Sequence, residues 1–377
     1  MIVQQQPPLH LTYCLNIHPG ETWAENFAAI RQHAMEVKKR IAPDRPFGLG
    51  LRLSHAAADS LASGPRRADV RKFFDDHGLY AFTVNGFPYG QFHGTRVKEN
   101  VYAPDWRAPE RRDYTNLLAD ILADLLPDGV NGSISTVPGS FKPWINNESD
   151  VKAMAANLAA CAENLADRNI CLALEPEPGC FLETTDETIR FLSEHLPDRA
   201  RRRIGVCFDT CHAAVQFENV AQSLQRYLDA GIRVAKVQLS AAVEESAEGL
   251  KQFSDSVYLH QTKAKRADGS FVYWNDLPDA LAAWAGSPDP ARGAGKPRPQ
   301  KTAIVRSHFH VPLFAGNSTA AELTPEFFAV LRRGATEHLE IETYTFDVLP
   351  KELRANNVVD HIVREYEWVI KRLESKV

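Results

Sequence analysis

The segment IGVCFDTCHA at residues 204–213 carries an aspartate at the end of an apolar run and a histidine three residues later. If the run is a strand and the histidine lies on the turn that follows, Asp209 and His212 can reach one metal ion or one substrate. An alternative stays open, in which Asp209 caps the next helix and His212 only packs there. Cys207 and Cys211 flank the aspartate, and we interpret them as small buried apolar residues.

Two other segments place glutamates at the ends of apolar runs. In LALEPEPG, Glu175 directly follows the run and Glu177 lies two residues further on. In HLEIETYTF, Glu340 and Glu342 share one face of an expected strand, and Glu342 lies nearer its carboxyl end. We predict Glu175 and Glu342 as metal ligands and as the catalytic base and acid, and Glu177 as a substrate contact. In the alternative, one of the last two glutamates pairs with an arginine inside the barrel.

The segment SHFHVPLF carries His308 and His310 two residues apart. In an extended chain both side chains project to the same side, so the pair can serve one metal site. We predict His310 as a metal ligand and His308 as a substrate contact. His93 and His260 are interpreted as ordinary loop histidines.

Further polar residues end other expected strands. Gln238 is a predicted amide ligand, and His18 and Arg52 are predicted substrate contacts. The complete predicted ligand set is Glu175, Asp209, His212, Gln238, His310 and Glu342. Carboxylate, amide and imidazole donors of this kind suit a divalent cation such as Mn²⁺, Zn²⁺, Mg²⁺ or Co²⁺.

Eight short apolar runs, each followed by a plausible helix, supply the elements that must position these residues. The expected strands are 10–18, 47–54, 80–86, 132–137, 170–175, 204–209, 234–239 and 339–344. The spacings Thr22-x-x-Glu25 and Thr184-x-x-Glu187 predict capping boxes, and Thr324-Pro325 predicts a helix start. Apolar runs without polar alternation are typical of parallel strands covered on both faces. With a closing helix near 356–373, the pattern predicts an α/β protein of the (β/α)8 TIM-barrel class, whose sites lie at the carboxyl ends of the strands.

Two stretches are longer than ordinary connections. Residues 87–109 are rich in glycine, proline and aromatic residues and are expected to form a long loop over one mouth of the barrel. Residues 241–306 form a larger insertion, whose run SPDPARGAGKPRPQK is expected to be exposed and mobile. We expect one barrel domain over 1–377 with these two insertions.

Composition narrows the function classes. The 377 residues include 43 Lys+Arg and 48 Asp+Glu, a net charge of −5, which gives no general electrostatic footprint for nucleic acid. The sequence has no leader pattern and no apolar run long enough to cross a membrane, so a cytoplasmic protein is expected. Its six scattered cysteines signal neither a disulfide framework nor a thiolate zinc site.

At IGVCFDTCHA and LALEPEPG the sequence resembles the xylose isomerase-like TIM-barrel superfamily, which includes sugar isomerases, ketose 3-epimerases, inosose dehydratases and the endonuclease IV group. The resemblance implies a metal held by Glu175, Asp209, Gln238 and Glu342, with His212 close to the metal or substrate. Within the superfamily, LTYCLNIHPGETW, SHFHVPLF and LEIETYTFDVLP resemble the EboE metabolite-traffic proteins over nearly the whole chain. That family is associated with a gene cluster that moves or processes a secondary-metabolite precursor.

The sequence departs from this pattern at two strand ends. Gln238 stands where epimerases and endonuclease IV usually have histidine, which implies a harder or more weakly held metal. Val137 stands where endonuclease IV has a ligand histidine before Pro-Gly-Ser, which counts against a three-zinc centre. His308-x-His310 is the counterpart of a D-x-H pair that binds an additional zinc in endonuclease IV-like enzymes.

Three functions follow as hypotheses. The first is a metal-dependent isomerase or epimerase of a sugar, cyclitol or related polyhydroxylated metabolite, in which a chelated carbonyl acidifies the adjacent C–H. The second is a non-catalytic metabolite-binding protein on the same barrel. The third, disfavoured by the net charge and by both departures, is an endonuclease IV-like phosphodiesterase. The oligomeric state stays open.

Overall fold

The computed structural model describes residues 1–94, 96–285 and 304–375. Eight parallel strands form its centre, and the sheet closes because Cys14, just after β2, bridges in parallel to Gly50 of β3. These strands are β2 (Leu9–Tyr13), β3 (Phe47–Arg52), β4 (Leu79–Asn85), β5 (Gly132–Thr136), β6 (Ile170–Leu174), β7 (Ile204–Asp209), β8 (Val234–Leu239) and β13 (His338–Ile341). A short strand, β1 (Ile2–Gln4), pairs antiparallel with β2. The predicted TIM-barrel fold is confirmed.

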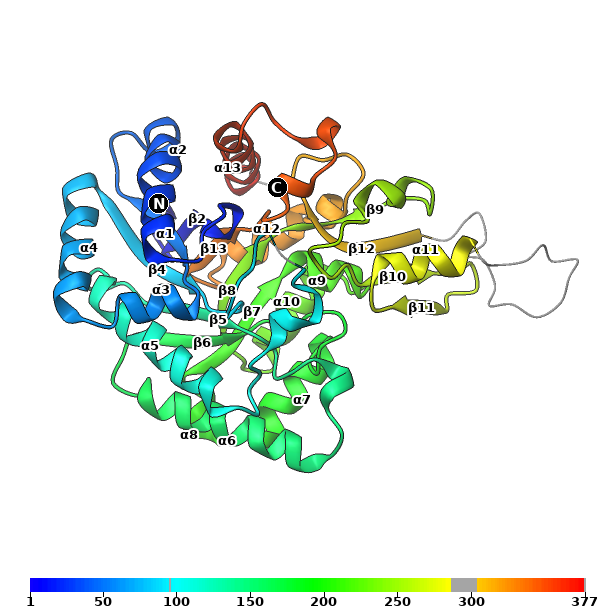
Figure 1. Cartoon of the computed structure of the whole chain (residues 1–377), viewed down its shortest axis with the longest axis horizontal. Coiled ribbons are helices and arrows are strands. Elements are labelled where there is room, and N and C mark those ends of the chain that lie inside the picture. The colour runs from blue at the N-terminus through cyan, green and yellow to red at the C-terminus, as the bar shows by residue number, and fades with distance from the viewer. Residues whose placement is uncertain (95, 286–303, 376–377) are drawn as a thin grey trace, which may run out of the picture.

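Helices surround the strands, as Figure 1 shows. They are α1 (Trp23–Ala29), α2 (Met35–Ile41), α3 (His55–Ser60), α4 (Gly64–His77), α5 (Pro109–Leu125), α6 (Glu148–Asn164), α7 (Thr185–His195), α8 (Asp198–Arg201), α9 (Thr210–Val215), α10 (Val220–Asp229), α12 (Pro325–Arg332) and α13 (Val358–Glu374). A single π-helical turn joins α1 to α2. None of the helices in the described part of the chain combines the length and the apolar character that crossing a membrane requires.

Local signals in the sequence set several helix starts. Both predicted capping boxes form, with Thr22 and Glu25 at the start of α1 and Thr184 and Glu187 at the start of α7. In each box the threonine hydroxyl and the glutamate carboxylate satisfy backbone N–H groups that the first turn leaves without partners. Thr324 likewise caps α12.

The 241–306 insertion contains more regular structure than a loop. It forms β9 (Ala241–Glu244), β10 (Thr262–Lys265), β11 (Phe271–Trp274), α11 (Leu277–Ala285) and the start of β12 (Ile304–Val311). The four strands pair antiparallel in the order β11-β10-β12-β9, and β9 follows β8 almost directly. The sheet extends to the right of the barrel in Figure 1. The run predicted to be exposed and mobile, residues 287–301, lies outside the described residues.

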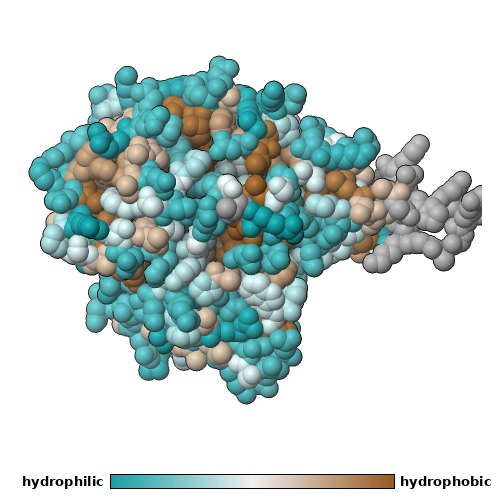
Figure 2. Space-filling view, viewed as in Figure 1, coloured by the Kyte–Doolittle hydropathy of each residue, from teal (hydrophilic) through white to brown (hydrophobic). Residues whose placement is uncertain are grey.

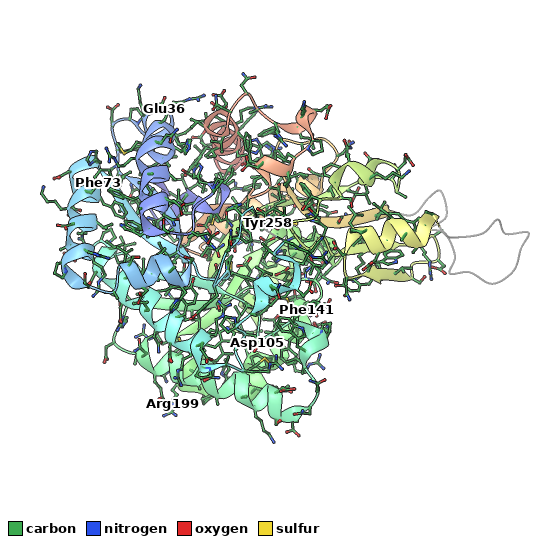
Figure 3. The ribbon with its side chains drawn as sticks, in the orientation of Figure 1. Glu36, Phe73, Asp105, Phe141, Arg199 and Tyr258 are labelled. Carbon is green, nitrogen blue, oxygen red and sulfur yellow. The ribbon has the colours of Figure 1, made fainter. Side chains whose placement is uncertain are left out.

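The 87–109 segment is mostly irregular, as predicted, with one short 3-10 turn at Lys98–Tyr102. It meets the second insertion, because the backbone N–H groups of Val97 and Lys98 both donate to the Val257 carbonyl. Figure 3 shows Tyr258 near the middle of the molecule, whereas Glu36, Phe73 and Arg199 lie on the outer helices. Two segments far apart in sequence thus lie together over the barrel.

A buried ion pair lies inside the barrel. Lys236 of β8 and Glu340 of β13 form it, and both side chains are fully buried. The Glu340 carboxylate also lies close to Gly50 of β3. Only glycine fits at position 50, because a Cβ there would lie 1.8 Å from Glu340 Oε1. Glu340 therefore forms the ion pair of the alternative, with a lysine in place of the expected arginine, and Glu342 stays available at the carboxyl end of the strand.

Candidate metal centre and pocket

Three carboxylates meet at the carboxyl end of the barrel. Glu175 directly follows β6, Asp209 ends β7 and Glu342 directly follows β13. One oxygen from each lies within 4.8 Å of one from each of the others, and all three side chains are buried. Parallel strands bring their carboxyl ends to one rim, which is why residues so distant in sequence converge.

The hydrogen bonds of these carboxylates leave one oxygen of Glu175 and one of Asp209 without a partner. Glu342 Oε1 accepts from the side-chain amides of Asn16 at 2.8 Å and Asn85 at 2.9 Å. Asp209 Oδ1 accepts from the Ser240 hydroxyl at 2.8 Å and caps α9 through the backbone N–H of residue 212. Asp209 Oδ2 and Glu175 Oε2 are buried and have no hydrogen-bond partner. Asp209 is therefore a helix cap and also offers a free oxygen, as a cation ligand would.

Crowding of these negative groups shifts their proton affinities. Burial, and then the charge of Glu342, raises the pKa of Glu175 well above its usual value. Burial, and then the charge of Asp209, raises the pKa of Glu342 in the same way. Burial also opposes ionisation of Asp209, but its neighbours, including hydrogen bonds from the backbone N–H of residue 212 and from the Ser240 hydroxyl, hold its pKa below the usual value. Full ionisation of all three would need a counter-charge, which a divalent cation supplies.

Three imidazoles form a second group beside the carboxylates. His212 lies on α9, and His308 and His310 lie on β12. His308 Nε2 is 3.1 Å from Nε2 of both His212 and His310. Each Nδ1 lies against an oxygen that can only accept a hydrogen bond. The partner of His212 is the Pro176 carbonyl at 2.8 Å, and that of His308 is the Gln261 side-chain oxygen at 2.7 Å. The partner of His310 is the Glu342 carbonyl at 2.9 Å.

This arrangement fixes the imidazole tautomers. Gln261 Nε2 donates to Glu177 Oε1 and to the Pro178 carbonyl, so its side-chain oxygen faces His308. With a proton on every Nδ1, neutral rings direct three Nε2 lone pairs at one another, and no hydrogen bond can join them. Burial, and then the neighbouring imidazoles, lowers the pKa of His308 well below its usual value; burial lowers that of His310 to about 4. Neutral, oriented imidazoles are the form that binds a metal.

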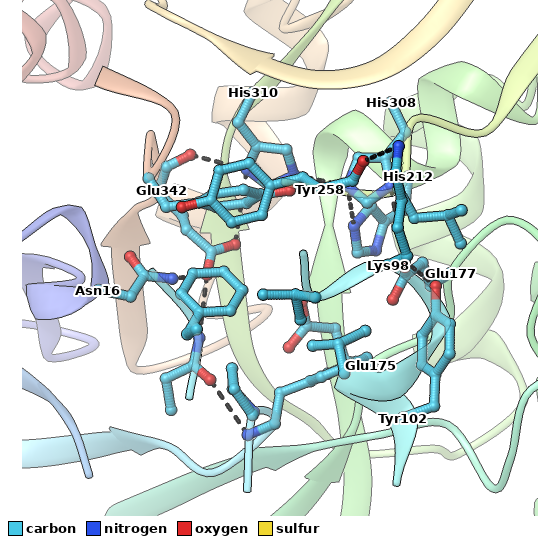
Figure 4. A pocket seen from close by; sticks show the side chains of 18 residues that line it. Asn16, Lys98, Tyr102, Glu175, Glu177, His212, Tyr258, His308, His310 and Glu342 are labelled. Atoms are coloured by element: carbon cyan, nitrogen blue, oxygen red, sulfur yellow. Dashed lines mark hydrogen bonds and ion pairs between the residues drawn. The ribbon is translucent and has the colours of Figure 1, made fainter. Parts of the chain in front are cut away.

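Asp209 links the two groups. Its carboxylate, His212 and His310 also offer ligand atoms within 4.8 Å of one another. Imidazole donors are therefore available from α9 and β12, whereas β8 offers the Gln238 amide. Cys211 lies close to His308 and His310, but burial raises the pKa of its thiol well above the usual value. Figure 4 shows the three histidines along one side of the opening, with Glu342 on one flank and Glu177 on the other.

A pocket opens onto both groups. Its lining includes Glu175, Glu177 and Glu342 together with all three histidines. The space between the lining atoms is ≈ 530 Å³, open solvent at its mouth included. Glu177 Oε1 accepts from the Tyr102 hydroxyl at 2.7 Å, so this predicted substrate contact is held at the pocket wall.

Four predicted site residues are absent from the described lining of the pocket. Asp209 belongs to the carboxylate group described above, and the other three bond elsewhere in the protein. Gln238 is buried in the barrel, where its side-chain oxygen accepts from the Cys207 thiol at 2.6 Å. His18 bonds the Tyr13 hydroxyl at 3.0 Å. Arg52 bonds the carbonyls of Gly20 and Gly90 and the Glu21 carboxylate. The predictions that Gln238 is a metal ligand and that His18 and Arg52 contact the substrate are not supported, because these side chains bond other groups of the protein.

Sequence reasoning missed several pocket residues. Tyr102 and Gln261 hold Glu177 and His308, and Lys98 and Tyr258 line the opening. All four lie in the two insertions, and their aromatic content was the one available signal. His260, interpreted as an ordinary loop histidine, bonds the His308 carbonyl at 2.7 Å and so helps to place β12.

A buried glutamate on α13 ties together two chain segments that reach the site. Glu365 Oε1 accepts from the Thr343 hydroxyl at 2.7 Å and the Leu313 N–H at 3.2 Å, just beyond Glu342 and His310. Its Oε2 lies 3.7 Å from His361 Nε2. Burial raises the pKa of Glu365 from its ordinary 4.5 to about 7.

This shift predicts a pH-dependent effect of Glu365→Gln. The unfolded chain ionises the carboxyl above pH 4.5 while the folded protein keeps it protonated, so its contribution to stability is lost as pH rises through 7. Glutamine keeps the accepting oxygen and does not ionise. The unfolding free energy of the variant minus that of wild type should therefore rise by about 3 kcal/mol from acidic to neutral pH. Urea unfolding at both pH values measures this difference. A pH-independent difference would contradict the assignment; Glu367→Gln, exposed on the same helix, is the control.

Comparisons with known proteins agree with the fold. A family model described as xylose isomerase-like TIM barrel matches residues 48–270. No curated protein matches the chain. Among solved structures, the probable 3-DHS dehydratase AsbF from Bacillus anthracis is similar, with TM-score 0.52, 15% identity and coverage of 98% of this chain and 100% of that one.

Two other similar structures contain bound groups. The D-allulose 3-epimerase from Methylomonas sp., in complex with D-allulose, has TM-score 0.54, 15% identity and 97% coverage of both chains. The IOLI protein with a bound zinc atom has TM-score 0.54, 11% identity and coverage of 98% of this chain and 100% of that one. At these identities the likeness shows the fold alone. Because the family model matches more than half of the chain, the protein belongs to the xylose isomerase-like TIM-barrel family.

Proposed function

We propose that the protein is a divalent-metal-dependent isomerase or epimerase of a sugar, cyclitol or related polyhydroxylated metabolite. The observation that carries the proposal is the convergence of Glu175, Asp209 and Glu342 at the carboxyl end of the barrel, where Glu175 Oε2 and Asp209 Oδ2 have no hydrogen-bond donor among the described residues. The epimerases and dehydratase among its structural neighbours support an enzyme of this general type.

The residues present fit a metal ion. Asp209 would hold it together with Glu175 and Glu342 on one side and His212 and His310 on the other. Mixed oxygen and imidazole donors favour zinc, manganese or cobalt over magnesium. When bound, the ion would polarise a carbonyl and a neighbouring hydroxyl of the substrate.

The two glutamates are placed to move a proton. Glu175 follows β6 and Glu342 follows β13, and the β7–β8 pair lies between these strands in the sheet. The carboxylates therefore approach the pocket from different sides, as removal and return of a proton at one carbon require. We assign Glu175 as general base and Glu342 as general acid. The Asn16 and Asn85 amides fix one oxygen of Glu342 and so set the direction of the other.

The remaining polar side chains hold the substrate. Glu177, fixed by Tyr102 and Gln261, can accept a hydrogen bond from a substrate hydroxyl. His308, whose Nδ1 is committed to Gln261, presents Nε2 to the same space.

Hydrogen exchange from solvent tests the proposal. The metal-loaded protein, incubated in D₂O with a panel of ketoses and cyclitol ketones, should place deuterium on the carbon next to the carbonyl of at least one of them, detected by NMR. Protein stripped with a chelator should show no exchange above the solvent background, and added metal should restore it. Stoichiometric metal without exchange on any compound would contradict catalysis and favour the metabolite-binding alternative.

A further inference from the structure

Two kinds of residue line the pocket. The carboxylates and imidazoles come from the strand ends, α9 and β12, whereas the 87–109 loop and residue 259 of the second insertion contribute an apolar wall: Phe87, Pro88, Phe92, Val97, Val101 and Leu259. Figure 2, seen from the same side as Figure 1, shows apolar surface in the middle of this face, bordered by hydrophilic residues.

Two of the three tyrosines in the described lining, Tyr102 and Tyr258, have hydroxyls that are bonded within the protein. The Tyr258 hydroxyl is bonded to His93 Nδ1 at 2.8 Å, and the Tyr102 hydroxyl donates to Glu177. The Tyr258 ring packs against Phe92 and Tyr344, with centroids 5.2 and 5.1 Å away. These contacts hold the Tyr258 ring in place, so a ligand that reaches this ring meets an aromatic face.

No cationic group in the described lining is left for an anionic ligand. Lys98 is the only lysine or arginine among the described residues that line the pocket. Its Nζ donates to Asp276 at 2.6 Å, to the Tyr258 carbonyl at 2.6 Å and to the Asp255 carbonyl at 3.5 Å, which uses all three of its N–H groups. A phosphate or carboxylate at the outer end of a ligand would lose its hydration without gaining a partner.

We infer that the ligand is an uncharged molecule with a chelating polyol or ketose head and an apolar group at its far end. The head meets the carboxylates and imidazoles, and the apolar group lies against the wall formed by the two insertions. This inference rests on the proposed function for the head and extends it to the rest of the ligand. It separates the expected substrate from sugar phosphates and from unsubstituted sugars.

Three probes that differ at one position test the inference. D-fructose carrying O6-benzyl, O6-methyl or O6-phosphate keeps the same head and changes only the far end. Isothermal titration calorimetry of the zinc-loaded full chain should show the benzyl ether binding about tenfold or more tightly than the methyl ether, because one aromatic ring leaves water. The phosphate should bind no more tightly than the methyl ether.

A substitution in the wall supplies the second measurement. Leu259→Ser should reduce the benzyl preference to about threefold or less while zinc content stays unchanged. Ile2→Ser, an equivalent change at an exposed position on β1, should keep the full preference.

The outcomes separate the inference from the proposed function. Equal binding of the two ethers, tighter binding of the phosphate, or no binding of any probe would overturn the inference, and solvent exchange on free ketoses would still support the isomerase. Preferential binding of the benzyl ether without deuterium exchange on any compound would overturn the proposed reaction and support the ligand class.

Discussion

Asp209→Asn is expected to weaken binding of zinc or manganese by more than about 100-fold, because Asp209 belongs to both the carboxylate and the imidazole groups. Asparagine keeps a side-chain oxygen that can accept from the His212 N–H and the Ser240 hydroxyl, so the start of α9 should survive. It removes the negative charge and the free oxygen that face the centre. Equilibrium dialysis followed by metal analysis measures the effect.

Glu337→Gln is the matched control for the metal measurement. Glu337 lies at the amino end of β13 and accepts from Asn131, at the opposite end of the barrel from the carboxylates. The substitution changes the net charge equally and should leave metal affinity unchanged. Wild-type affinity in Asp209→Asn, or an equal loss in both variants, would show that Asp209 is not a ligand.

Glu175→Gln and Glu342→Gln are each expected to slow solvent proton exchange by about 10²–10⁴-fold at saturating metal, the range that general acid–base groups contribute. Glutamine preserves size and one oxygen but cannot carry the proton. Exchange rates by NMR, with metal content measured on the same samples, separate loss of proton transfer from loss of the ion.

The comparison with Glu177→Gln makes this test specific. Glu177 accepts from Tyr102 and Gln261 and is assigned to substrate contact, so its substitution should raise KM more than it lowers kcat. Equal kcat losses in all three variants would contradict the assigned roles, as would exchange at the wild-type rate in Glu175→Gln or Glu342→Gln.

The barrel was predictable because its signals are local. The apolar runs 204–209 and 234–239 correspond to β7 and β8 residue for residue, but the helix expected after 234–239 is wrong, because β9 follows β8 and begins the insertion. The first strand ends earlier than predicted, at Tyr13, because the chain turns into a 3-10 helix at Leu15–Ile17. That turn directs His18 toward Tyr13 rather than into the pocket.

The part of the candidate site that lies directly at the strand ends of the barrel could be predicted from the sequence. Glu175, Asp209 and Glu342 follow from their places at strand ends. The contacts of Arg52 and Gln238 did not follow, because they depend on neighbours distant in sequence. The convergence of His212, His308 and His310 requires the antiparallel pairing of β12 with β9 and β10, which no local pattern encodes. Tyr102 and Gln261 depend in turn on how the two insertions meet.

The most direct test of the metal centre is anomalous X-ray scattering from crystals of the zinc- or manganese-loaded protein. The account predicts a peak at the carboxyl end of the barrel with an Asp209 oxygen about 2.0–2.2 Å away for zinc, and with Glu175 and Glu342 or His212 and His310 completing the coordination. A peak elsewhere, or a fully loaded protein in which Asp209 contacts no metal, would contradict it.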